Sequence, residues 1–392
     1  MTDRTVVIVG AKRTPIGSFQ GQFSDCSGVD LGAAAIAGAV EQAGIDPADA
    51  SEVIMGCVLP GAMGQAPARQ AMLKAGIPSS TGAMTINKVC GSGMKTVMLG
   101  HDAIRAGSSE IVVAGGMESM TNAPYLLPKG RSGYRMGHGQ LLDHMFTDGL
   151  QSPYDGQLMG IFGEMCAEKY GFDRVDQDAF AAVSIERAQL AVHEGHFVDE
   201  IVPVTVSTRR GDHVCAEDEE PHKCNIGKIP VLKPAFKKDG TVTAANASKI
   251  SDGAAAMVLM TAEEAERRGQ EALARIVAHA TFSQDPEWFT TAPSTAIAMA
   301  VEKAGWAMDE VDLFEINEAF ATVTMAAMHD NGIPHDKVNV NGGACALGHP
   351  IGASGARILV TLIYALRARG LKRGVASLCL GGGEAVAVAI EI

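Results

Sequence analysis

The sequence predicts an α/β fold built from two duplicated halves, and three observations carry this prediction. Residues 39–44 read Ala-Val-Glu-Gln-Ala-Gly and residues 300–305 read Ala-Val-Glu-Lys-Ala-Gly, an offset of 300 − 39 = 261. Glycine turns that end at Gly93 and at Gly355 each open an amphipathic helix pattern, an offset of 355 − 93 = 262. Strand and helix patterns alternate in both halves, which is typical of parallel strands joined by right-handed helical crossovers.

Each half follows the order strand, helix, strand, helix, strand, and its last strand runs into glycines. This strand begins near Glu110 in the first half and near Gly374 in the second. The second half closes with a predicted hairpin partner from Gly383, whereas the matching strand of the first half begins only at Asp252, so a segment is inserted into that hairpin. The predicted parts are a first half (1–121 plus 248–270), an inserted loop domain (122–247) and a second half (271–392).

The inserted segment differs in kind from the two halves. It is polar and loop-rich at 128–157, shows an amphipathic helix pattern at about 174–194, and carries mixed charges from Arg209 to Lys238. Ligands of open α/β sheets bind in loops at the carboxyl ends of the strands. Basic side chains of this segment could therefore hold a phosphate, with a solvated charged surface as the alternative.

Composition excludes several classes of protein. The 392 residues carry a formal net charge of −13, with a pI near 5.3, which argues against a general nucleic-acid or anionic-membrane surface. No stretch approaches the roughly 18 to 20 apolar residues that a membrane span needs, and the N-terminus does not resemble a targeting segment. We expect a cytoplasmic protein with free thiols, because the eight cysteines show no paired metal-binding spacing.

Cys90 is the first candidate for catalysis. It lies in the run from Asn87 to Gly93, directly ahead of an amphipathic helix pattern. The N–H groups and the dipole at a helix N-terminus favour the thiolate, which is the nucleophilic form of cysteine. A small buried cysteine is the commoner reason for such a residue, so the interpretation depends on partners elsewhere in the chain.

Three residues of the second half could complete a site around Cys90. The duplication places the loop of His349 opposite Cys90, where the imidazole could take the thiol proton. Cys379 ends a strand and could remove an acidic α-proton from a thioester, and Asn317 could orient a water or donor toward a developing oxyanion. Structural roles as a loop histidine, a core thiol and a turn asparagine are the alternatives.

Together, the motifs NKVCGSG, NEAF, GHPIGASGAR and CLGGG resemble those of the thiolase superfamily in order and spacing. The resemblance extends over essentially the whole chain. It implies the thiolase fold, five-layered αβαβα with two βαβαβαββ halves and a loop domain. It also implies a homotetramer built as a dimer of dimers, with a homodimer as the alternative, and the 122–145 loop resembles the tetramer-forming region of the family.

The resemblance also implies a role for each candidate. The cysteine matching Cys90 is acylated, the histidine matching His349 activates it, and the cysteine matching Cys379 moves the proton at the substrate α-carbon. The asparagine matching Asn317 holds a water that forms one oxyanion hole with His349, and the N–H groups of Cys90 and Gly381 would form the other. No metal or other cofactor is expected, because thioester chemistry needs only a nucleophile, a proton carrier and donors for negative charge.

Further positions match the contacts that the family makes with coenzyme A thioesters. The positions for the pantetheine arm are Phe236, Ala244, Ser248 and Ile250, and those for the nucleotide end are Lys223 and Lys228. The positions for the acyl group are Leu158, Met159, Phe289, Ala319 and Phe320. Leu158 departs from the histidine typical of short-chain acetoacetyl-CoA thiolases. Phe289 replaces the methionine of the bacterial biosynthetic type and is similar to the mitochondrial form, whose potassium-binding tyrosine falls at Ile185.

The implied activity is that of an acetyl-CoA C-acetyltransferase, which converts two acetyl-CoA into acetoacetyl-CoA and CoA through an acyl-Cys90 intermediate, or catalyses the reverse thiolysis. The main alternative, raised by Leu158, is a broader-chain 3-ketoacyl-CoA thiolase of fatty-acid β-oxidation. A decarboxylating ketosynthase would lack the second cysteine, Cys379. A non-catalytic acyl-CoA or lipid carrier would have lost at least one catalytic position.

Overall fold

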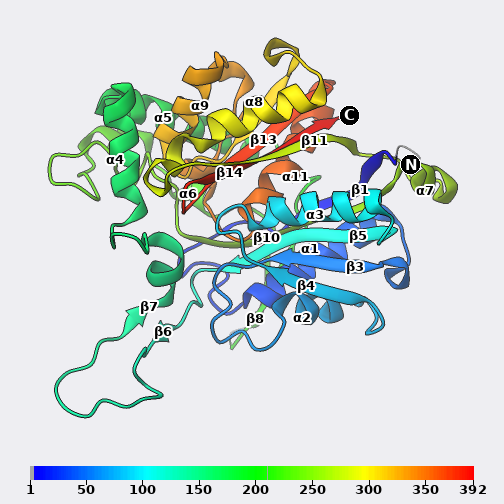
Figure 1. The fold of residues 1–392 in the computed structure, drawn as a ribbon, viewed down its shortest axis with the longest axis horizontal. Coiled ribbons are helices and arrows are strands. Elements are labelled where there is room, and N and C mark those ends of the chain that lie inside the picture. Colours follow the sequence, from blue (N-terminus) through cyan, green and yellow to red (C-terminus); the bar gives the residue numbers. More distant parts are fainter. Residues whose placement is uncertain (1–3, 210) are drawn as a thin grey trace.

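The computed structural model describes residues 4–209 and 211–392, so residues 1–3 of the predicted first half lie outside the described part. The fold has five layers, and the predicted αβαβα class is confirmed. Helices α1 (Gly28–Ala43) and α8 (Ala292–Ala304) cover the outer faces of two sheets, while α3 (Ser92–Ala106) and α11 (Ser354–Arg369) lie between the sheets (Figure 1). The middle layer therefore contains one helix from each half.

The strands of the first half follow the predicted pattern of parallel strands closed by an antiparallel partner. Strand β3 is parallel to β4 and β5, and β10 is antiparallel to β5 and to β1. Their bounds are β1 (Val6–Arg13), β3 (Glu52–Gly56), β4 (Gly82–Ile86), β5 (Ile111–Ser119) and β10 (Ser251–Thr261).

The second half repeats this arrangement. Strand β12 is parallel to β13, and β14 lies antiparallel between β13 and β11. Their bounds are β11 (Ala274–Ser283), β12 (Leu313–Ile316), β13 (Arg373–Leu380) and β14 (Glu384–Glu391). A short antiparallel pairing of β1 with β11, through Val7 with Arg275 and Ile8 with Ala274, joins the two sheets in the order β12-β13-β14-β11-β1-β10-β5-β3-β4.

The glycines that revealed the duplication lie where helices end or meet. Gly44 and Gly305 end α1 and α8 in the left-handed conformation, with φ of 59° and 72°. A Cβ on Gly93 of α3 would lie 2.8 Å from the main-chain nitrogen of Ala356 in α11, and one on Gly355 would lie 2.5 Å from that of Met94 in α3. The N-termini of α3 and α11 can therefore approach each other only because both residues lack a side chain.

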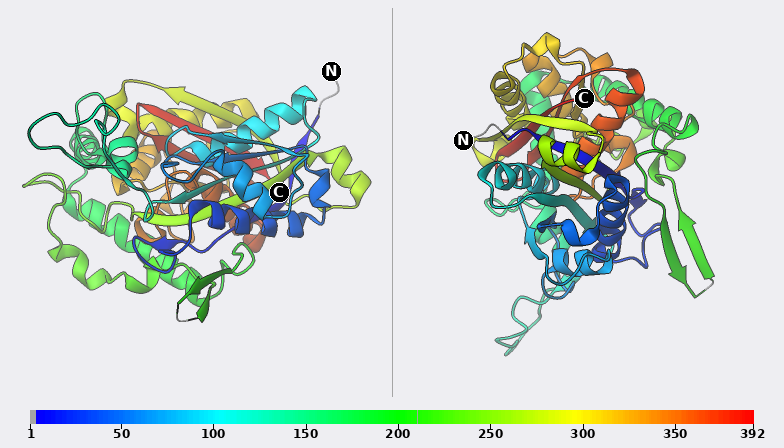
Figure 2. Two further views of the ribbon diagram at one scale, coloured as in Figure 1. Left: turned by 90° about the horizontal axis from the view of Figure 1, so that it is seen from below. Right: turned by 90° about the vertical axis from the view of Figure 1, so that its right-hand side faces the viewer.

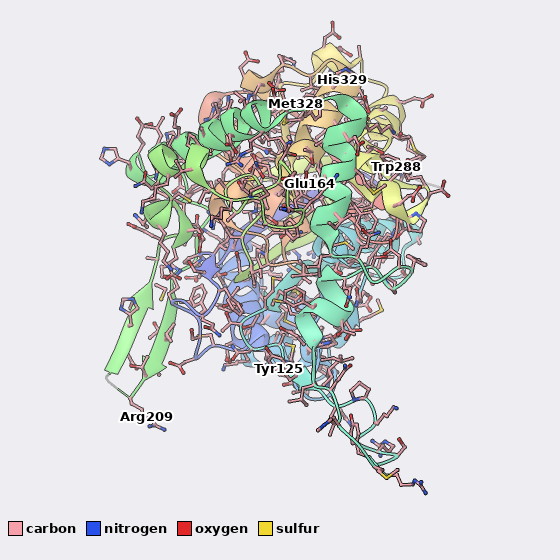
Figure 3. The ribbon with its side chains drawn as sticks, turned by 90° about the vertical axis from the view of Figure 1, so that its left-hand side faces the viewer. Tyr125, Glu164, Arg209, Trp288, Met328 and His329 are labelled. Carbon is pink, nitrogen blue, oxygen red and sulfur yellow. The ribbon has the colours of Figure 1, made fainter. Side chains whose placement is uncertain are left out.

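The inserted segment leaves the first half after β5 and returns at β10, where Ser119 pairs with Asp252. The predicted helix at about 174–194 is α5. The excursion between β6 and β7 and the hairpin of β8 and β9, with Arg209 near its tip, project from the body (Figures 2 and 3). The elements of the segment are β6 (Tyr125–Leu126), β7 (Leu142–Asp143), a π-helical turn (Phe146–Leu150), α4 (Met159–Tyr170), α5 (Arg174–His193), β8 (Val204–Thr208), β9 (Gly211–Cys215), α6 (Glu220–Lys223) and a 3₁₀ turn (Ile226–Val231).

The remaining elements are short or connect the larger ones. They are β2 (Gly17–Ser18), α2 (Pro67–Lys74), α7 (Ala262–Arg268), α9 (Ala321–Asn331), α10 (Ala344–Leu347) and 3₁₀ turns at Pro47–Asp49, Pro286–Thr291, Met308–Glu310 and His335–Lys337. Within the described ranges, no helix is both long enough and apolar enough to cross a lipid bilayer.

Candidate active site

Cys90 lies on a sharp turn between β4 and the N-terminus of α3. The preceding residue, Val89, has φ +46°, a conformation that a β-branched side chain rarely adopts. Hydrogen bonds hold this turn: Asn87 Oδ1 accepts from the Val89 N–H at 2.8 Å, and the Ser92 hydroxyl accepts from the Lys88 N–H at 2.8 Å and donates to the Val89 carbonyl at 2.6 Å. A strained residue that its surroundings hold in place is typical of a functional turn.

The thiol of Cys90 is partly buried beside Ile351 and the apolar residues around Leu59. Burial raises its pKa to about 11, although hydrogen bonds from the main-chain N–H groups of Gly381 and of Cys90 itself lower it. The main-chain donors at the helix N-terminus favour the thiolate, as expected, but desolvation outweighs them. The same two N–H groups were predicted to form an oxyanion hole, and both interact with the sulfur atom.

His349 lies in the loop before α11 and is buried. Its Nδ1 lies 2.5 Å from the Ser354 hydroxyl, which donates its own hydrogen to the Pro350 carbonyl at 2.9 Å. Because that hydroxyl must accept from the imidazole, we assign the ring hydrogen to Nδ1, which leaves Nε2 as the basic nitrogen. Burial, with the nearby charge of Arg357, lowers the pKa of His349 to about 3, so the ring is neutral near pH 7.

Asn317 follows β12 and is fully buried beside His349, with its Nδ2 3.5 Å from His349 Nε2. Its main-chain N–H donates to the Ser377 carbonyl at 3.0 Å, which fixes the turn to the neighbouring strand β13. Its Oδ1 is buried and has no hydrogen-bond partner among the described residues. A buried amide oxygen without a partner is the arrangement that a bound water or substrate donor would satisfy.

Cys379 is the penultimate residue of β13 and is buried with Phe289, Ala319, Phe320 and the partly buried Met159. Burial raises the pKa of its thiol well above the ordinary value, and the negative charge of a Cys90 thiolate raises it further. The two thiols are therefore close enough to influence each other's ionisation, and the structure brings together the two halves of the predicted site.

A cavity of about 480 Å³ leads to His349, a volume typical of a small-molecule site. Most of the predicted substrate positions line it: Leu158, Met159, Lys223, Phe236, Ala244, Ser248, Ile250 and Phe320. Phe289 instead lines a second cavity of about 290 Å³ together with Met159 and Gly381. Ala319 packs beside Cys379 and lines neither of these cavities.

The two lysines predicted for the nucleotide end differ. Lys223 lines the larger cavity, but its ammonium group already contacts Glu219 at 2.6 Å and Ser18 at 2.8 Å. Lys228 is exposed on the 3₁₀ turn of the inserted segment and is not among the lining residues, so the structure does not bring it to the cavity. Lys249, which sequence reasoning missed, lines the cavity; its place between Ser248 and Ile250 was the available signal.

Glu118 is a second residue that sequence reasoning missed. It is the single charged residue in the buried strand β5, and that pattern was its signal. Its carboxylate accepts main-chain N–H groups from Val58 at 2.9 Å, Leu59 at 3.1 Å and Gly352 at 2.9 Å. Glu118 therefore ties the loop after β3 to the loop that carries His349, and both loops contribute apolar neighbours of Cys90.

Comparison with known proteins decides the family. The family described as "Thiolase, N-terminal domain" matches residues 6–263, and "Thiolase, C-terminal domain" matches residues 270–392. The chain belongs to the thiolase family.

Similar full-length proteins agree with this assignment. This thiolase is 49% identical to an acetyl-CoA acetyltransferase of Pseudomonas aeruginosa over 98% of each chain, and 50% identical to one of Cupriavidus necator over the whole of each. Among solved structures, it resembles the acetyl-CoA acetyltransferase of Bacillus anthracis (TM-score 0.97, 42% identity, 99% of this chain and 98% of that one). It also resembles that of Syntrophomonas wolfei (TM-score 0.96, 39% identity, 99% of each chain).

Proposed function

We propose that this thiolase is an acetyl-CoA C-acetyltransferase that forms acetoacetyl-CoA from two acetyl-CoA, or cleaves it by thiolysis, through an acyl-Cys90 intermediate. The observation that carries the proposal is the position of Cys90, whose sulfur meets the N–H groups of Cys90 and Gly381 and lies close enough to the Cys379 thiol to influence its ionisation. The names of the relatives from P. aeruginosa and C. necator support the same reaction.

In the acylation step, the thioester carbonyl oxygen of acetyl-CoA lies between the N–H groups of Cys90 and Gly381, which stabilise the negative charge that develops there. His349 Nε2 takes the proton of Cys90 as its sulfur attacks the carbonyl carbon. The carbon–sulfur bond to CoA breaks, and Cys379 donates its proton to the leaving thiolate. CoA departs, and an acetyl-Cys90 remains with a Cys379 thiolate and a His349 imidazolium.

In the condensation step, the Cys379 thiolate removes a proton from the α-carbon of a second acetyl-CoA. The enolate oxygen is stabilised by the His349 imidazolium and the Asn317 side chain. The α-carbon attacks the acetyl group, the bond to Cys90 breaks, and His349 returns its proton to the Cys90 sulfur. The Cys379 proton leaves with CoA and is replaced by the α-proton of the second acetyl-CoA, and the Cys90 proton returns from His349. Each residue therefore ends in its starting protonation state, and we propose no metal or other cofactor for the reaction.

Intact-mass spectrometry after incubation with acetyl-CoA tests the proposal, with Cys90→Ala as the matched control. We expect one acetyl adduct per chain in the wild type and none in Cys90→Ala, together with loss of thiolysis. An unmodified wild type, or an adduct that persists in Cys90→Ala, would contradict the acyl-Cys90 mechanism.

The second cavity favours one alternative, a thiolase of broader chain length. It adjoins Met159, Phe289 and Gly381, so an acyl chain attached to Cys90 could extend into its 290 Å³. Rates of thiolysis for acetoacetyl-CoA and 3-ketooctanoyl-CoA separate the two functions. We expect the four-carbon substrate to react faster, whereas a much faster eight-carbon reaction would favour the broader enzyme.

We further propose a homotetramer and a cytoplasmic location. Apolar side chains along the excursion between β6 and β7 support the assembly: Tyr125, Leu127, Met136 and Leu141 are all exposed, and the excursion extends away from the body (Figures 2 and 3). The eight free thiols support a reducing compartment. Light scattering of the wild type and of Met136→Asp tests the assembly; we expect a tetramer and a smaller species, and a dimeric wild type would contradict it.

A further inference from the structure

A group of metal-ligating side chains lies away from the active site, on the C-terminal part of α3 and on β11. His101 Nδ1 lies 3.1 Å from Asp102 Oδ1, and His279 Nε2 lies 2.9 Å from the same oxygen. The three ligand atoms all lie within 4.8 Å of one another. The two imidazole rings meet edge to face, with 5.0 Å between their centroids.

The spacing of these atoms suits one small cation. Zn²⁺ binds histidine nitrogen and carboxylate oxygen at about 2.0 to 2.2 Å in a tetrahedron, which places the ligand atoms about 3.3 to 3.6 Å apart. The distances from His101 Nδ1 and from His279 Nε2 to Asp102 Oδ1, 3.1 Å and 2.9 Å, are slightly shorter than this ligand spacing. Modest side-chain movement would therefore open the space that the ion requires. The side chain of Asp102 is 54% exposed, which leaves a route for the ion and for a water ligand.

The types of ligand favour the same kind of ion. Two imidazoles and one carboxylate are a ligand set that first-row transition metals prefer over Mg²⁺ or Ca²⁺.

We propose that His101, Asp102 and His279 form a structural binding site for one divalent transition-metal ion of the zinc type, with water completing the coordination. The ion would join α3 of the first half to β11 of the second. Cys90 lies eleven residues before His101, about 16 Å along the helix axis, so the ion takes no part in the chemistry. Lys95 and Arg105 on α3, and Lys303, which donates to the His279 carbonyl at 3.2 Å, add positive charge that moderates the affinity.

The chain offers a matched control. His329 and Asp330 on α9 form the same adjacent pair, with Nδ1 3.1 Å from Oδ1, and His329 is exposed at the surface (Figure 3). Among the described residues, no third histidine, cysteine, aspartate or glutamate joins this second pair in a ligand group. Because Zn²⁺ and Co²⁺ also bind thiolates, the titrations use protein whose Cys90 has been alkylated.

Metal titration of EDTA-treated protein tests the site. Visible absorption reports the binding of Co²⁺, and calorimetry and Tm report the binding of Zn²⁺. We expect one ion per chain, a rise in Tm, and binding that is weaker by more than about tenfold in His279→Gln and in Asp102→Asn but unchanged in His329→Gln. Thiolysis by the unalkylated proteins, without added metal, checks that each variant folds. Asp102→Asn, at the exposed position, provides the test if His279→Gln does not fold. Equal binding by wild type and both variants, or no binding by the wild type, would overturn the proposal.

Discussion

The reactivity of Cys90 depends on two opposing influences on a single sulfur atom. Burial raises its pKa to about 11, and the N–H groups of Gly381 and Cys90 pull it down. The pKa of His349 is lowered to about 3, so proton transfer between the two in the free enzyme is unfavourable. The pair therefore rests as thiol and neutral imidazole, and the charge needed for attack develops only when a thioester carbonyl accepts the two N–H groups.

This resting state predicts how fast Cys90 is alkylated at different pH values. Because the pKa lies well above neutral, the thiolate fraction rises about tenfold for each pH unit below it, and iodoacetamide reacts with the thiolate. We expect the rate of Cys90 modification, followed by peptide mass mapping in the absence of substrate, to climb through pH 6 to 9 without a plateau. A plateau below pH 8 would instead indicate a resting thiolate–imidazolium pair.

Ser354 fixes the orientation and tautomer of His349. Removing its hydroxyl in Ser354→Ala leaves the Nδ1 hydrogen buried without an acceptor, a cost that corresponds to a fall of about 10- to 100-fold in kcat. The KM for acetoacetyl-CoA should change less, because Ser354 is not among the residues that line the cavity. Ser354→Thr keeps the hydroxyl and should recover most of the rate. Equal kcat in Ser354→Ala and wild type would show that the tautomer does not depend on Ser354.

At the scale of elements, the N-terminus of α3 and that of α11 form the part of the fold that positions Cys90 and His349 relative to each other. Gly93 and Gly355 allow the two helices to meet main chain to main chain. The methyl group of Gly93→Ala would meet the main chain of Ala356 and Gly352, which cannot move without shifting the His349 loop. We expect Gly93→Ala to lower the stability by about 1 to 3 kcal/mol and to reduce kcat, measured by urea unfolding and by thiolysis.

Gly227→Ala is the control for this effect. Gly227 lies on an exposed turn, and a Cβ there would make an ordinary contact, 3.4 Å from the side chain of Asn225. Its stability and thiolysis should stay close to those of the wild type. Similar losses in Gly227→Ala and Gly93→Ala would mean that close helix approach is not the cause.

The same elements define how far the sequence could predict the fold and the site. The repeats at 39–44 and 300–305, and the glycine turns before α3 and α11, predicted two duplicated α/β halves, because a helix end and a close approach each require glycine. The five layers were implied by the resemblance to the thiolase superfamily. The pairing of β1 with β11 could not be predicted from the sequence, because it involves only two residue pairs and leaves no recognisable sequence pattern. Lys228 does not line the cavity, and the sequence of an inserted segment does not determine which side chains of its turns reach a cavity.

Charges were the least predictable part of the site. The position of Cys90 at a helix N-terminus was evident from the sequence, but its high pKa depends on how completely Ile351 and its neighbours exclude water. Glu118 was overlooked because its partners are main-chain N–H groups of Val58, Leu59 and Gly352, which no side-chain motif records. Desolvation and main-chain donors are properties of the assembled fold.

For the whole molecule, a buried ionic cluster connects all three parts of the chain. Arg13 on β1 contacts Glu200 at 2.5 Å and Asp218 at 2.7 Å, both in the inserted segment, and none of the three side chains is exposed. Thr361 of α11, in the second half, donates to Glu200 at 3.0 Å. The cluster therefore holds the inserted segment, which supplies much of the cavity wall, against both halves.

Removing one partner of such a cluster leaves the others buried and unpaired, so Arg13→Met should lower the free energy of unfolding by about 3 to 5 kcal/mol. Arg267→Met is the control, because Arg267 pairs with Glu264 at the surface of one helix, where ion pairs contribute little. Thermal unfolding should show a clear fall in Tm for Arg13→Met and almost none for Arg267→Met. If Arg13→Met cannot be purified, Thr361→Val removes one hydrogen bond to Glu200 and should cause a smaller fall. An Arg13→Met protein as stable as Arg267→Met would mean that apolar packing alone joins the inserted segment to the two halves.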